Sequence, residues 1–220
     1  MVPKRAEVDG GRRGRGESAG LRMDDVVDTA CQLLDADGWE KFSIRRVAVQ
    51  LGVTPAALYQ HVASKEQLLD LVADRYLDQL NLPDHRNGWE QALELFLHDL
   101  RTLVLRRPLV AHVMLHHQVE GRGSYRVANA VLGLLRDAGF DSATAVEVFT
   151  TACTYTLGFA LLEGTRRAAP VSGDDRARRL RTELSGELPV LASTASEYAH
   201  WWSRQHFSSA ITRMIGSYRP

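Results

Sequence analysis

The chain has 220 residues, 45% of them hydrophobic and 25% charged, with 27 basic and 27 acidic side chains. This composition excludes an intrinsically disordered chain and fits either one full core or a small module joined to a larger one. Because the global charge is balanced, only a local cluster of charge can indicate a polyanionic partner such as nucleic acid.

The first 21 residues are rich in glycine and arginine and contain almost nothing apolar. Such a segment cannot offset the entropy of ordering by burying apolar surface, so we expect residues 1–21 to form a flexible basic arm. The segment also lacks the apolar region of a secretory signal sequence.

The remaining indicators of location favour the cytoplasm. The longest uncharged run, Val148 to Leu162, is shorter than the ~20 apolar residues of a membrane span. Cys31 and Cys153 lie in apolar helical patterns, which fits two core thiols in a reducing compartment. We therefore expect a cytoplasmic protein with no membrane partner.

Helical periodicity begins at Asp24, which we predict to cap a first helix that ends at Gly38. Ser43 is predicted to cap a second, short helix, and Gly52 to supply the left-handed residue at its end. The apolar residues of these two helices recur at helical spacing: Val26, Val27, Ala30, Leu33, Leu34, Ile44, Val47, Ala48 and Leu51.

Thr54 followed by Pro55 is a strong helix-start signal, because threonine accepts a bond from a free backbone N–H and proline has none to leave unpaired. We predict a third helix from Pro55 to His61. The sequence from Ser64 to Gln67 has the form of a capping box and opens a fourth, longer helix.

Beyond Pro83 every segment has helical character, so the fold class is predicted to be all-α. We place a helix-turn-helix domain at residues 22–68 and a larger helical domain at residues 69–220, with a mobile loop within Arg166–Arg181. The predicted helices of the larger domain are Trp89–Leu105, Pro108–His117, Ser124–Ala138, Ser142–Glu163, part of Asp174–Leu184, and Ala195–Ser217.

The second helix, a tight turn at Gly52-Val53 and the capped third helix have the proportions of a helix-turn-helix, whose second helix enters the major groove. The stretch from Lys41 to Lys65 contains four basic residues and no carboxylate. Tyr59, His61 and Lys65 lie in the last part of this stretch, and all three can donate hydrogen bonds to phosphate oxygens. Taken singly, each fits a packing or solvated residue, but together they favour a DNA-binding surface.

The motif FSIRRVA from Phe42, followed by LGVTPAALYQHV from Leu51 and Ser64-Lys65, resembles the TetR family of bacterial transcriptional repressors. This resemblance implies that Tyr59, His61 and Lys65 contact phosphates. Apolar residues on the reading helix favour contact with thymine methyl groups together with an Arg45 contact. The positions that the resemblance and the helix cap place near bases or backbone are Ser43, Arg45, Thr54, Pro55, Ala56 and Gln60.

A second, weaker resemblance links Ala138-Gly139-Phe140 and the stretch Ala152–Phe159 to the regulatory domain of the tetracycline repressor subgroup. It implies a homodimer whose core is formed by the last helices of two subunits. Two apolar stripes fit that core, or equally the core of one subunit. They consist of Ala145, Val148, Ala152, Phe159 and Leu162, and of Phe207, Ala210, Ile211, Met214 and Ile215.

A helical bundle that binds a small molecule places a few polar groups in an apolar cavity. Eight candidates follow the helix-turn-helix domain, in the larger domain: Trp89, His98, His112, His116, His117, Tyr125, Asn129 and Tyr155. The resemblance favours His116, Asn129 and Tyr155, and we add His112 as the fourth predicted ligand-binding residue. Each of these side chains also fits a core residue whose polar group bonds a backbone carbonyl.

Two other functions compete with a ligand-responsive repressor that binds a palindromic operator as a dimer. His112 and His116 have the spacing of metal ligands, but no glutamate lies between them to act as the base of a metal hydrolase. An architectural DNA-binding protein would use the basic arm but would not need a large apolar second domain. We therefore expect no enzyme, catalytic residue, metal or cofactor, and we expect DNA, a small-molecule effector and a second copy as partners.

Overall fold

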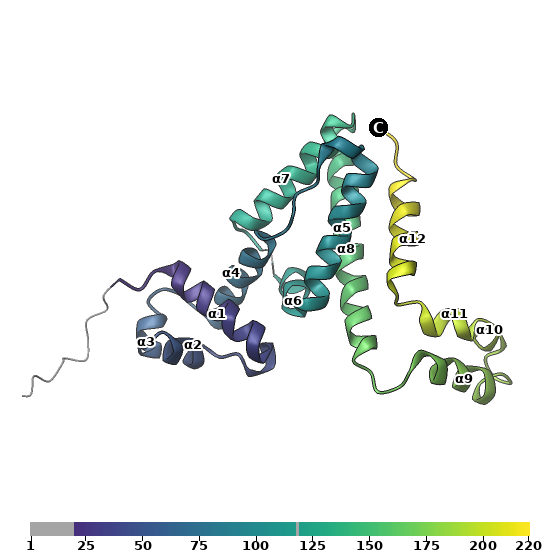
Figure 1. The fold of residues 1–220 in the computed structure, drawn as a ribbon, viewed down its shortest axis with the longest axis horizontal. Helices are drawn as coiled ribbons and strands as arrows, with labels where there is room; N and C mark the ends of the chain where they lie inside the picture. Colours follow the sequence, from purple (N-terminus) through teal and green to yellow (C-terminus); the bar gives the residue numbers. More distant parts are fainter. Residues whose placement is uncertain (1–19, 118) are drawn as a thin grey trace, which may run out of the picture. The chain divides into compact units, whose positions relative to one another are not determined.

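The computed structural model describes residues 20–117 and 119–220, and the regular secondary structure within these ranges is helical (Figure 1). The chain divides into two compact units, an N-terminal unit up to Lys65 and a C-terminal unit from Glu66. The predicted division after residue 68 falls three residues later. Except for its last two residues, the predicted arm lies outside the described residues.

The N-terminal unit is a small helical cluster. Its helices are α1 (Met23–Asp37), the 3-10 helix η1 (Trp39–Lys41), α2 (Ile44–Gln50) and α3 (Pro55–Leu58). Lys65, the last residue of this unit, is also the first residue of α4 (Lys65–Leu77). Helix α2 packs against both α1 and α3. The apolar side chains that fill the unit are buried: Val26, Val27, Ala30, Leu34, Phe42, Ile44, Val47, Ala48, Leu58 and Val62.

The ends of α1 and α3 differ in part from the prediction. Helix α1 begins at Met23, one residue before Asp24, and Arg22 occupies the cap position. Asp24 therefore lies in the first turn, where its negative charge interacts favourably with the positive end of the helix dipole. Gly38 ends α1 with φ of +77°, as predicted. Helix α3 ends at Leu58, and the chain continues to His61 as turns.

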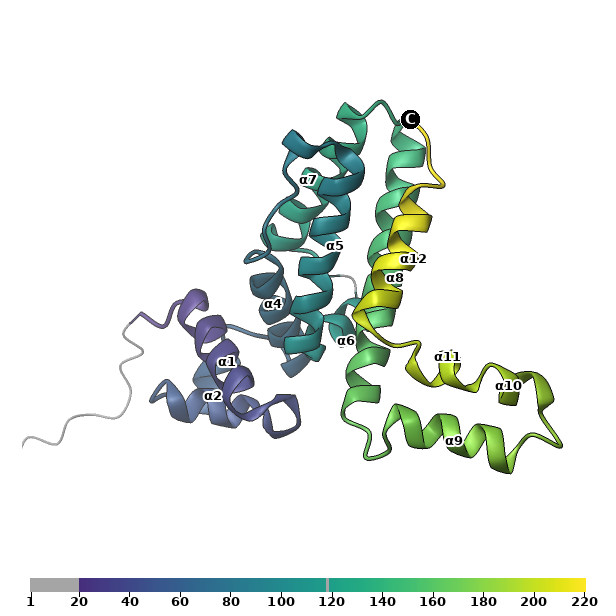
Figure 2. The same ribbon diagram turned by 45° about the vertical axis from the view of Figure 1, so that its right-hand side comes forward.

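The C-terminal unit is built around two long helices, α5 (Trp89–Arg106) and α8 (Ser142–Arg167), which pack along each other (Figure 2). Helices α6 (Pro108–His116), α7 (Arg122–Asp137) and α12 (Arg204–Ile215) each pack against both of them. A 3-10 helix, η2 (His85–Asn87), precedes α5. The largest side chains buried in this unit include Tyr76, Phe96, Leu97, Leu100, Leu135, Phe207 and Ile211.

Three short helices, α9 (Gly173–Glu183), α10 (Pro189–Ser193) and α11 (Ala195–His200), pack on one another between α8 and α12. The predicted single helix over 195–217 is wrong, because Trp201–Ser203 separates α11 from α12 and the side chain of Ser203 caps α12 at the N–H of His206. The predicted loop within 166–181 shrinks to residues 168–172, since α8 extends to Arg167 and α9 begins at Gly173.

Helix α8 is long and apolar enough to cross a membrane by length and composition alone. It packs against α5, α6, α7 and α12, and it carries the fully buried Glu163 in an ion pair with α5. These contacts identify α8 as a core helix of this unit.

The two predicted apolar stripes lie mainly inside the single subunit. Ala145, Val148, Ala152 and Phe159 are buried on α8, as are Phe207, Ile211 and Ile215 on α12. By contrast, Leu162 is 45% exposed. Of the two interpretations left open by the sequence, the structure supports a subunit core for most of these residues.

Three aspartates at four-residue spacing, Asp70 and Asp74 on α4 and Asp78 directly after it, contact the end of α6 and the start of α7. Asp70 contacts the ring of His117 at 2.7 Å, and Asp74 accepts hydrogen bonds from the N–H groups of Gly123 and Ser124 at 3.0 and 2.7 Å. Asp78 forms an ion pair with Arg126 at 2.9 Å. Asp74 and Asp78 therefore join the end of α4 to the start of α7, and Asp70 joins α4 to the residue that follows α6.

Candidate DNA-binding surface and ligand cavity

The helix-turn-helix is fixed by two side-chain caps and one glycine. Ser43 accepts a hydrogen bond from the N–H of Arg46 at 3.3 Å, and Thr54 accepts one from the N–H of Ala57 at 3.2 Å. Gly52 between the two helices has φ of +69°, a conformation that disfavours any residue with a side chain. These local features, all predicted from the sequence, set the angle at which α3 leaves the unit.

Helix α3 has its polar and small residues on the outside. Leu58 is fully buried, whereas Tyr59 is 51% exposed. Ser43, His61 and Lys65 are partly exposed, and the other six predicted DNA-binding residues are exposed: Arg45, Thr54, Pro55, Ala56, Tyr59 and Gln60. The structure therefore brings the predicted residues onto one module with free access to solvent.

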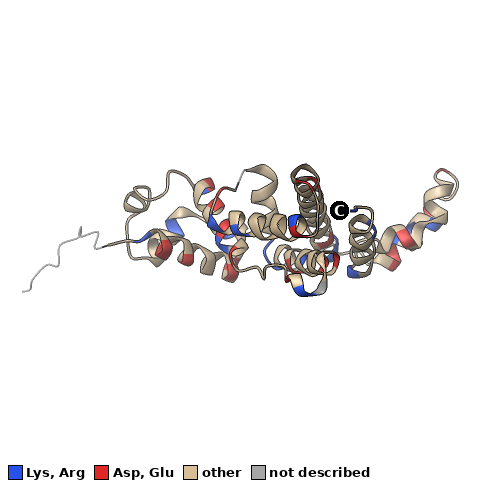
Figure 3. Cartoon of the chain, turned by 90° about the horizontal axis from the view of Figure 1, so that it is seen from above, with Lys and Arg blue, Asp and Glu red and all other residues tan. Residues whose placement is uncertain are grey.

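The stretch that carries this surface has basic residues and no carboxylate between Lys41 and Lys65. Every carboxylate among residues 20–65 lies between Asp24 and Glu40, so residues 41–65, which form α2, α3 and the first residue of α4, contain none, and Glu66 follows directly. Figure 3 marks the charged residues along the ribbon. Arg46 is paired with Asp37, so Arg45 is the free arginine of α2. The ammonium of Lys65 lies 5.9 Å from the ring centre of Phe42, a cation–π contact that holds it near the module.

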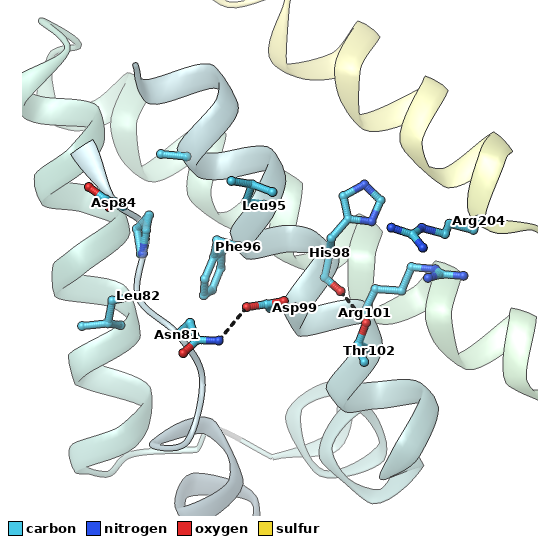
Figure 4. Close-up of a pocket in the computed structure, with 12 residues that line it drawn as sticks. Asn81, Leu82, Asp84, Leu95, Phe96, His98, Asp99, Arg101, Thr102 and Arg204 are labelled. Atoms are coloured by element: carbon cyan, nitrogen blue, oxygen red, sulfur yellow. Dashed lines mark hydrogen bonds between the residues drawn. The ribbon is translucent and has the colours of Figure 1, made fainter. Parts of the chain in front are cut away.

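A cavity of about 460 Å³ lies in the C-terminal unit beside α5. This volume is within the range of sites for small molecules. Its lining comes from α5, from the connection between α4 and α5, and from the first residue of α12 (Figure 4). The lining residues are Asn81, Leu82, Pro83, Asp84, Ala92, Leu95, Phe96, His98, Asp99, Arg101, Thr102 and Arg204.

One wall of the cavity rests on a buried ion pair. Arg101 donates from Nε and Nη2 to the two carboxylate oxygens of Glu163, at 2.8 and 2.5 Å, and Arg167 reaches the same carboxylate at 2.6 Å. The Arg101 guanidinium also lies 5.3 Å from the ring centre of Phe207 on α12. These contacts tie α5, α8 and α12 together directly behind the cavity.

His98 lies at the end of the cavity that Arg101 lines (Figure 4). Burial lowers the pKa of its imidazole; Glu94 opposes this shift, while the positive charges of Arg204 and Arg101 add to it. Its Nε2 lies 3.2 Å from the hydroxyl of Ser208 on α12. At the other end, Asp99 accepts a hydrogen bond from the side chain of Asn81 at 3.1 Å.

The four predicted ligand-binding residues do not line this cavity. His112 and His116 are exposed neighbours on α6 with ring centres 4.5 Å apart, and Asn129 is exposed on α7. Tyr155 on α8 is half-buried and stacks against Phe207 with ring centres 6.1 Å apart. These side chains therefore remain predicted ligand contacts that the subunit does not gather around one described cavity.

Of the lining residues, only His98 was among the wider set of polar candidates from the sequence. Arg101 carried a signal that reasoning from the sequence missed, because it follows Leu97 and Leu100 within the apolar stripe of its helix. A charge in such a position requires a buried partner. Its partner lies 62 residues away, and no local pattern reveals it.

No group of three or more histidine, cysteine, aspartate or glutamate side chains in the described ranges has the arrangement of a metal site. Cys31 is buried, and burial raises the pKa of Cys153 to about 12. The Cys153 thiol therefore remains protonated at neutral pH, which disfavours a role as a nucleophile or metal ligand.

Family models match both units. Residues 26–72 match the model of bacterial regulatory proteins of the tetR family, and residues 82–216 match the tetracyclin repressor-like C-terminal domain. The HTH-type transcriptional repressor DrrR1 of Streptomyces coeruleorubidus is 32% identical over 219 residues, covering 94% of this chain and 81% of that protein. The class E tetracycline repressor of Escherichia coli is 30% identical over 152 residues, covering 66% and 70%.

Solved structures agree with these matches. The TetR family protein ActR of Streptomyces coelicolor in complex with actinorhodin has a TM-score of 0.81 and 27% identity, covering 90% of this chain and 97% of that one. BioQ bound to its double-stranded DNA operator has a TM-score of 0.58 and 28% identity, covering 79% and 99%.

The fold and the exposed helix-turn-helix define a DNA-binding transcription regulator, not an enzyme. The chain belongs to the TetR family of transcriptional repressors.

Proposed function

We propose that this protein represses transcription by binding a palindromic operator as a homodimer in the cytoplasm and that a small-molecule effector releases it. The observation that carries the DNA-binding part is the capped, outward-facing segment from Thr54 to Gln60, in a stretch without carboxylates. ActR, which crystallised with actinorhodin, and BioQ, which crystallised on its operator, support the same division of labour between the two units.

Each DNA-binding residue has a role in this proposal. Tyr59, His61 and Lys65 bind phosphates and set the position of the module on the duplex. Pro55 and Ala56 contact thymine methyl groups, and Arg45 reaches a guanine edge. Ser43, Thr54 and Gln60 act at the backbone or beside the bases, and the two caps also hold the reading helix in place.

The effector cavity is proposed to be the 460 Å³ space beside α5, which is larger than the two cavities of about 300 and 240 Å³ beside α2 and near Tyr76. The alternative is the predicted set His112, His116, Asn129 and Tyr155, which would need a rearrangement of α6 and α7. A Leu95→Trp substitution fills the cavity, whereas Asn129→Ala leaves it unchanged. Loss of the ligand response in the first variant alone supports the cavity, and loss in the second alone supports the alternative.

Release is proposed to pass through α4, which starts at the DNA-binding unit and is joined to α7 by Asp74 and by Asp78 directly after the helix. An effector that prefers one position of α4 changes the separation of the two reading helices in the dimer. A ~100-fold preference corresponds to about 2.7 kcal/mol, which is within the usual range of allosteric coupling.

The test is selection of bound DNA from a random pool by the full-length protein, followed by competition with candidate ligands. We expect an inverted repeat whose half-sites are centred about one helical turn, or ~34 Å, apart. Recovery of sequences with no shared motif would contradict a specific repressor and favour an architectural protein. Operator binding that no bound ligand weakens would contradict the effector part alone.

A further inference from the structure

The cavity beside α5 has a different charge at each of its two ends. Arg204 and Arg101 extend toward each other at one end, next to the imidazole of His98 (Figure 4). Asp99 and Asn81 form the other end, where they are hydrogen-bonded to each other. Such a polarity restricts the ligands that the cavity can hold.

The guanidinium of Arg204 is the free charge at the first end. Among the described residues its side chain forms neither an ion pair nor a hydrogen bond, and it is exposed at the first turn of α12. Carboxylates that occur elsewhere in the lining are already engaged, since Asp84 is paired with Arg86 and Asp99 accepts from Asn81. Arg204 is therefore a positive group that no protein carboxylate neutralises.

Arg101 is held from behind by Glu163, which occupies its Nε and Nη2. Its remaining amino group, Nη1, has no hydrogen-bond partner in the described part of the chain, although Arg101 lines the cavity. Because this guanidinium is already held in one orientation, little conformational entropy is lost when it donates to a ligand. Two guanidinium groups that share one cavity end favour a bound anion between them.

The wall between the two ends is apolar. Leu95 on α5 and Leu82 on the preceding connection present exposed apolar side chains there, 55% and 37% exposed, and the buried Phe96 completes the lining. A small inorganic anion would leave this surface in water, whereas a ring system would cover it. The volume of about 460 Å³ accommodates one or more fused rings.

We propose that this cavity binds a hydrophobic organic acid, with the carboxylate between Arg204 and Arg101, the ring body on Leu95 and Leu82, and a hydroxyl or amino donor toward Asp99. The inference rests on the proposed effector function and adds the chemical class of the effector. In this proposal Arg204 selects ligands that carry a negative charge, and the apolar wall selects ligands with a ring system.

The test uses direct binding of ligands to the full-length protein without DNA, measured by isothermal titration calorimetry. The probes are mono-, bi- and tricyclic aromatic carboxylic acids that carry a ring hydroxyl, such as 6-hydroxy-2-naphthoic acid, and the matched carboxamides. A charge-assisted hydrogen bond predicts that an acid binds at least about tenfold more tightly than its amide. Arg204→Gln should remove this preference and Arg204→Lys should keep most of it.

The matched control is Arg213→Gln, which removes an exposed arginine from the same helix outside the cavity and should leave the preference unchanged. If no acid binds more tightly than its amide, or if Arg204→Gln and Arg213→Gln behave alike, the proposal is wrong. Displacement of the bound acid by inorganic phosphate at equal concentration would also overturn it, because the ring body would then contribute nothing.

Operator binding is measured separately, with the same acids. An acid that binds through Arg204 without weakening operator binding would support the ligand class and contradict the effector role. Release of the operator by neutral ring compounds alone would support the effector role and contradict the ligand class.

Discussion

Glu163 shows at the scale of one residue how a charge is kept in the core. Its side chain has no exposed surface, that of Arg101 is 5% exposed, and that of Arg167 is 61% exposed. Removing one partner of a buried pair leaves an uncompensated charge, which costs about 3–5 kcal/mol. We expect Glu163→Gln to lower the free energy of unfolding by about that amount, measured by urea denaturation.

The control for this prediction is Arg167→Gln, because an exposed ion pair contributes less than about 1 kcal/mol. If Glu163→Gln does not yield folded protein, replacing Glu163 and Arg101 together by methionine should restore folding, since a buried pair can be exchanged for apolar side chains. Equal losses from Glu163→Gln and Arg167→Gln would show that the carboxylate is not buried in solution.

The proposed mode of DNA binding gives Lys65 and Arg45 different roles, a phosphate contact and a base contact. A lysine on a phosphate acts through counterion release, so each contact adds about 0.9 to the slope of log K against log salt. We expect Lys65→Gln to weaken binding to all sequences and to flatten this slope by about one per subunit, measured by fluorescence anisotropy. Arg45→Ala should instead relax the preference for one base pair. A change of preference in Lys65→Gln with an unchanged slope would reverse the two assignments.

At the scale of elements, the contact between α4 and α7 depends on a glycine at the start of α7. A Cβ at Gly123 would lie 2.2 Å from the carbonyl oxygen of Asp74, so only glycine allows the close approach. The carboxylate of Asp74 caps the first free N–H groups of α7, and loss of such a cap costs ~0.5–2 kcal/mol. We therefore expect Asp74→Ala to cost about 1–2 kcal/mol and Gly123→Ala to cost more, measured by thermal unfolding.

Gly133 provides the control within the same helix. A Cβ there would meet no atom within 4 Å. Alanine in place of glycine in a helix interior gains about 0.5–1 kcal/mol, so Gly133→Ala should raise the stability that Gly123→Ala lowers. If both alanine variants shift the melting temperature in the same direction, the close approach of α7 to α4 does not exist in solution.

Helix ends that depend on a local cap could be predicted from the sequence, as at Ser43, Thr54 and Gly38. The break before α12 was missed although Ser203 carries the same cap signal, because the apolar spacing on both sides of it suggested one continuous helix. Contacts that join distant segments could not be predicted, since nothing local links Arg101 to Glu163. This is why local sequence signals sufficed to name a candidate DNA-binding surface, whereas most of the cavity lining could not be named from the sequence.

At the scale of the whole molecule, most residues of the two apolar stripes are buried inside one subunit. Because they cannot also contact a second subunit, a dimer must form through another surface. Helix α8 has one on its outer side, where no charged residue occurs between Glu147 and Glu163. Its exposed residues there are small or apolar: Thr150, Thr151, Thr154 and Leu162. Gly158 lies on the same side, and a Cβ there would meet nothing within the subunit.

Small uncharged side chains let two helices approach closely, whereas a charge at their centre would be buried without a partner. We therefore expect Thr154→Arg to give a folded monomer, seen as a halved mass by light scattering with an unchanged helical circular dichroism spectrum. Gln91→Arg, an exposed change on α5, should remain a dimer. Because one helix-turn-helix alone covers only half of a palindromic operator, the monomer should lose most of the operator affinity while keeping weak, salt-sensitive binding to any DNA. A Thr154→Arg protein that is still a dimer would place the subunit interface elsewhere, and a folded monomer with full operator affinity would contradict the proposed two-fold mode of binding.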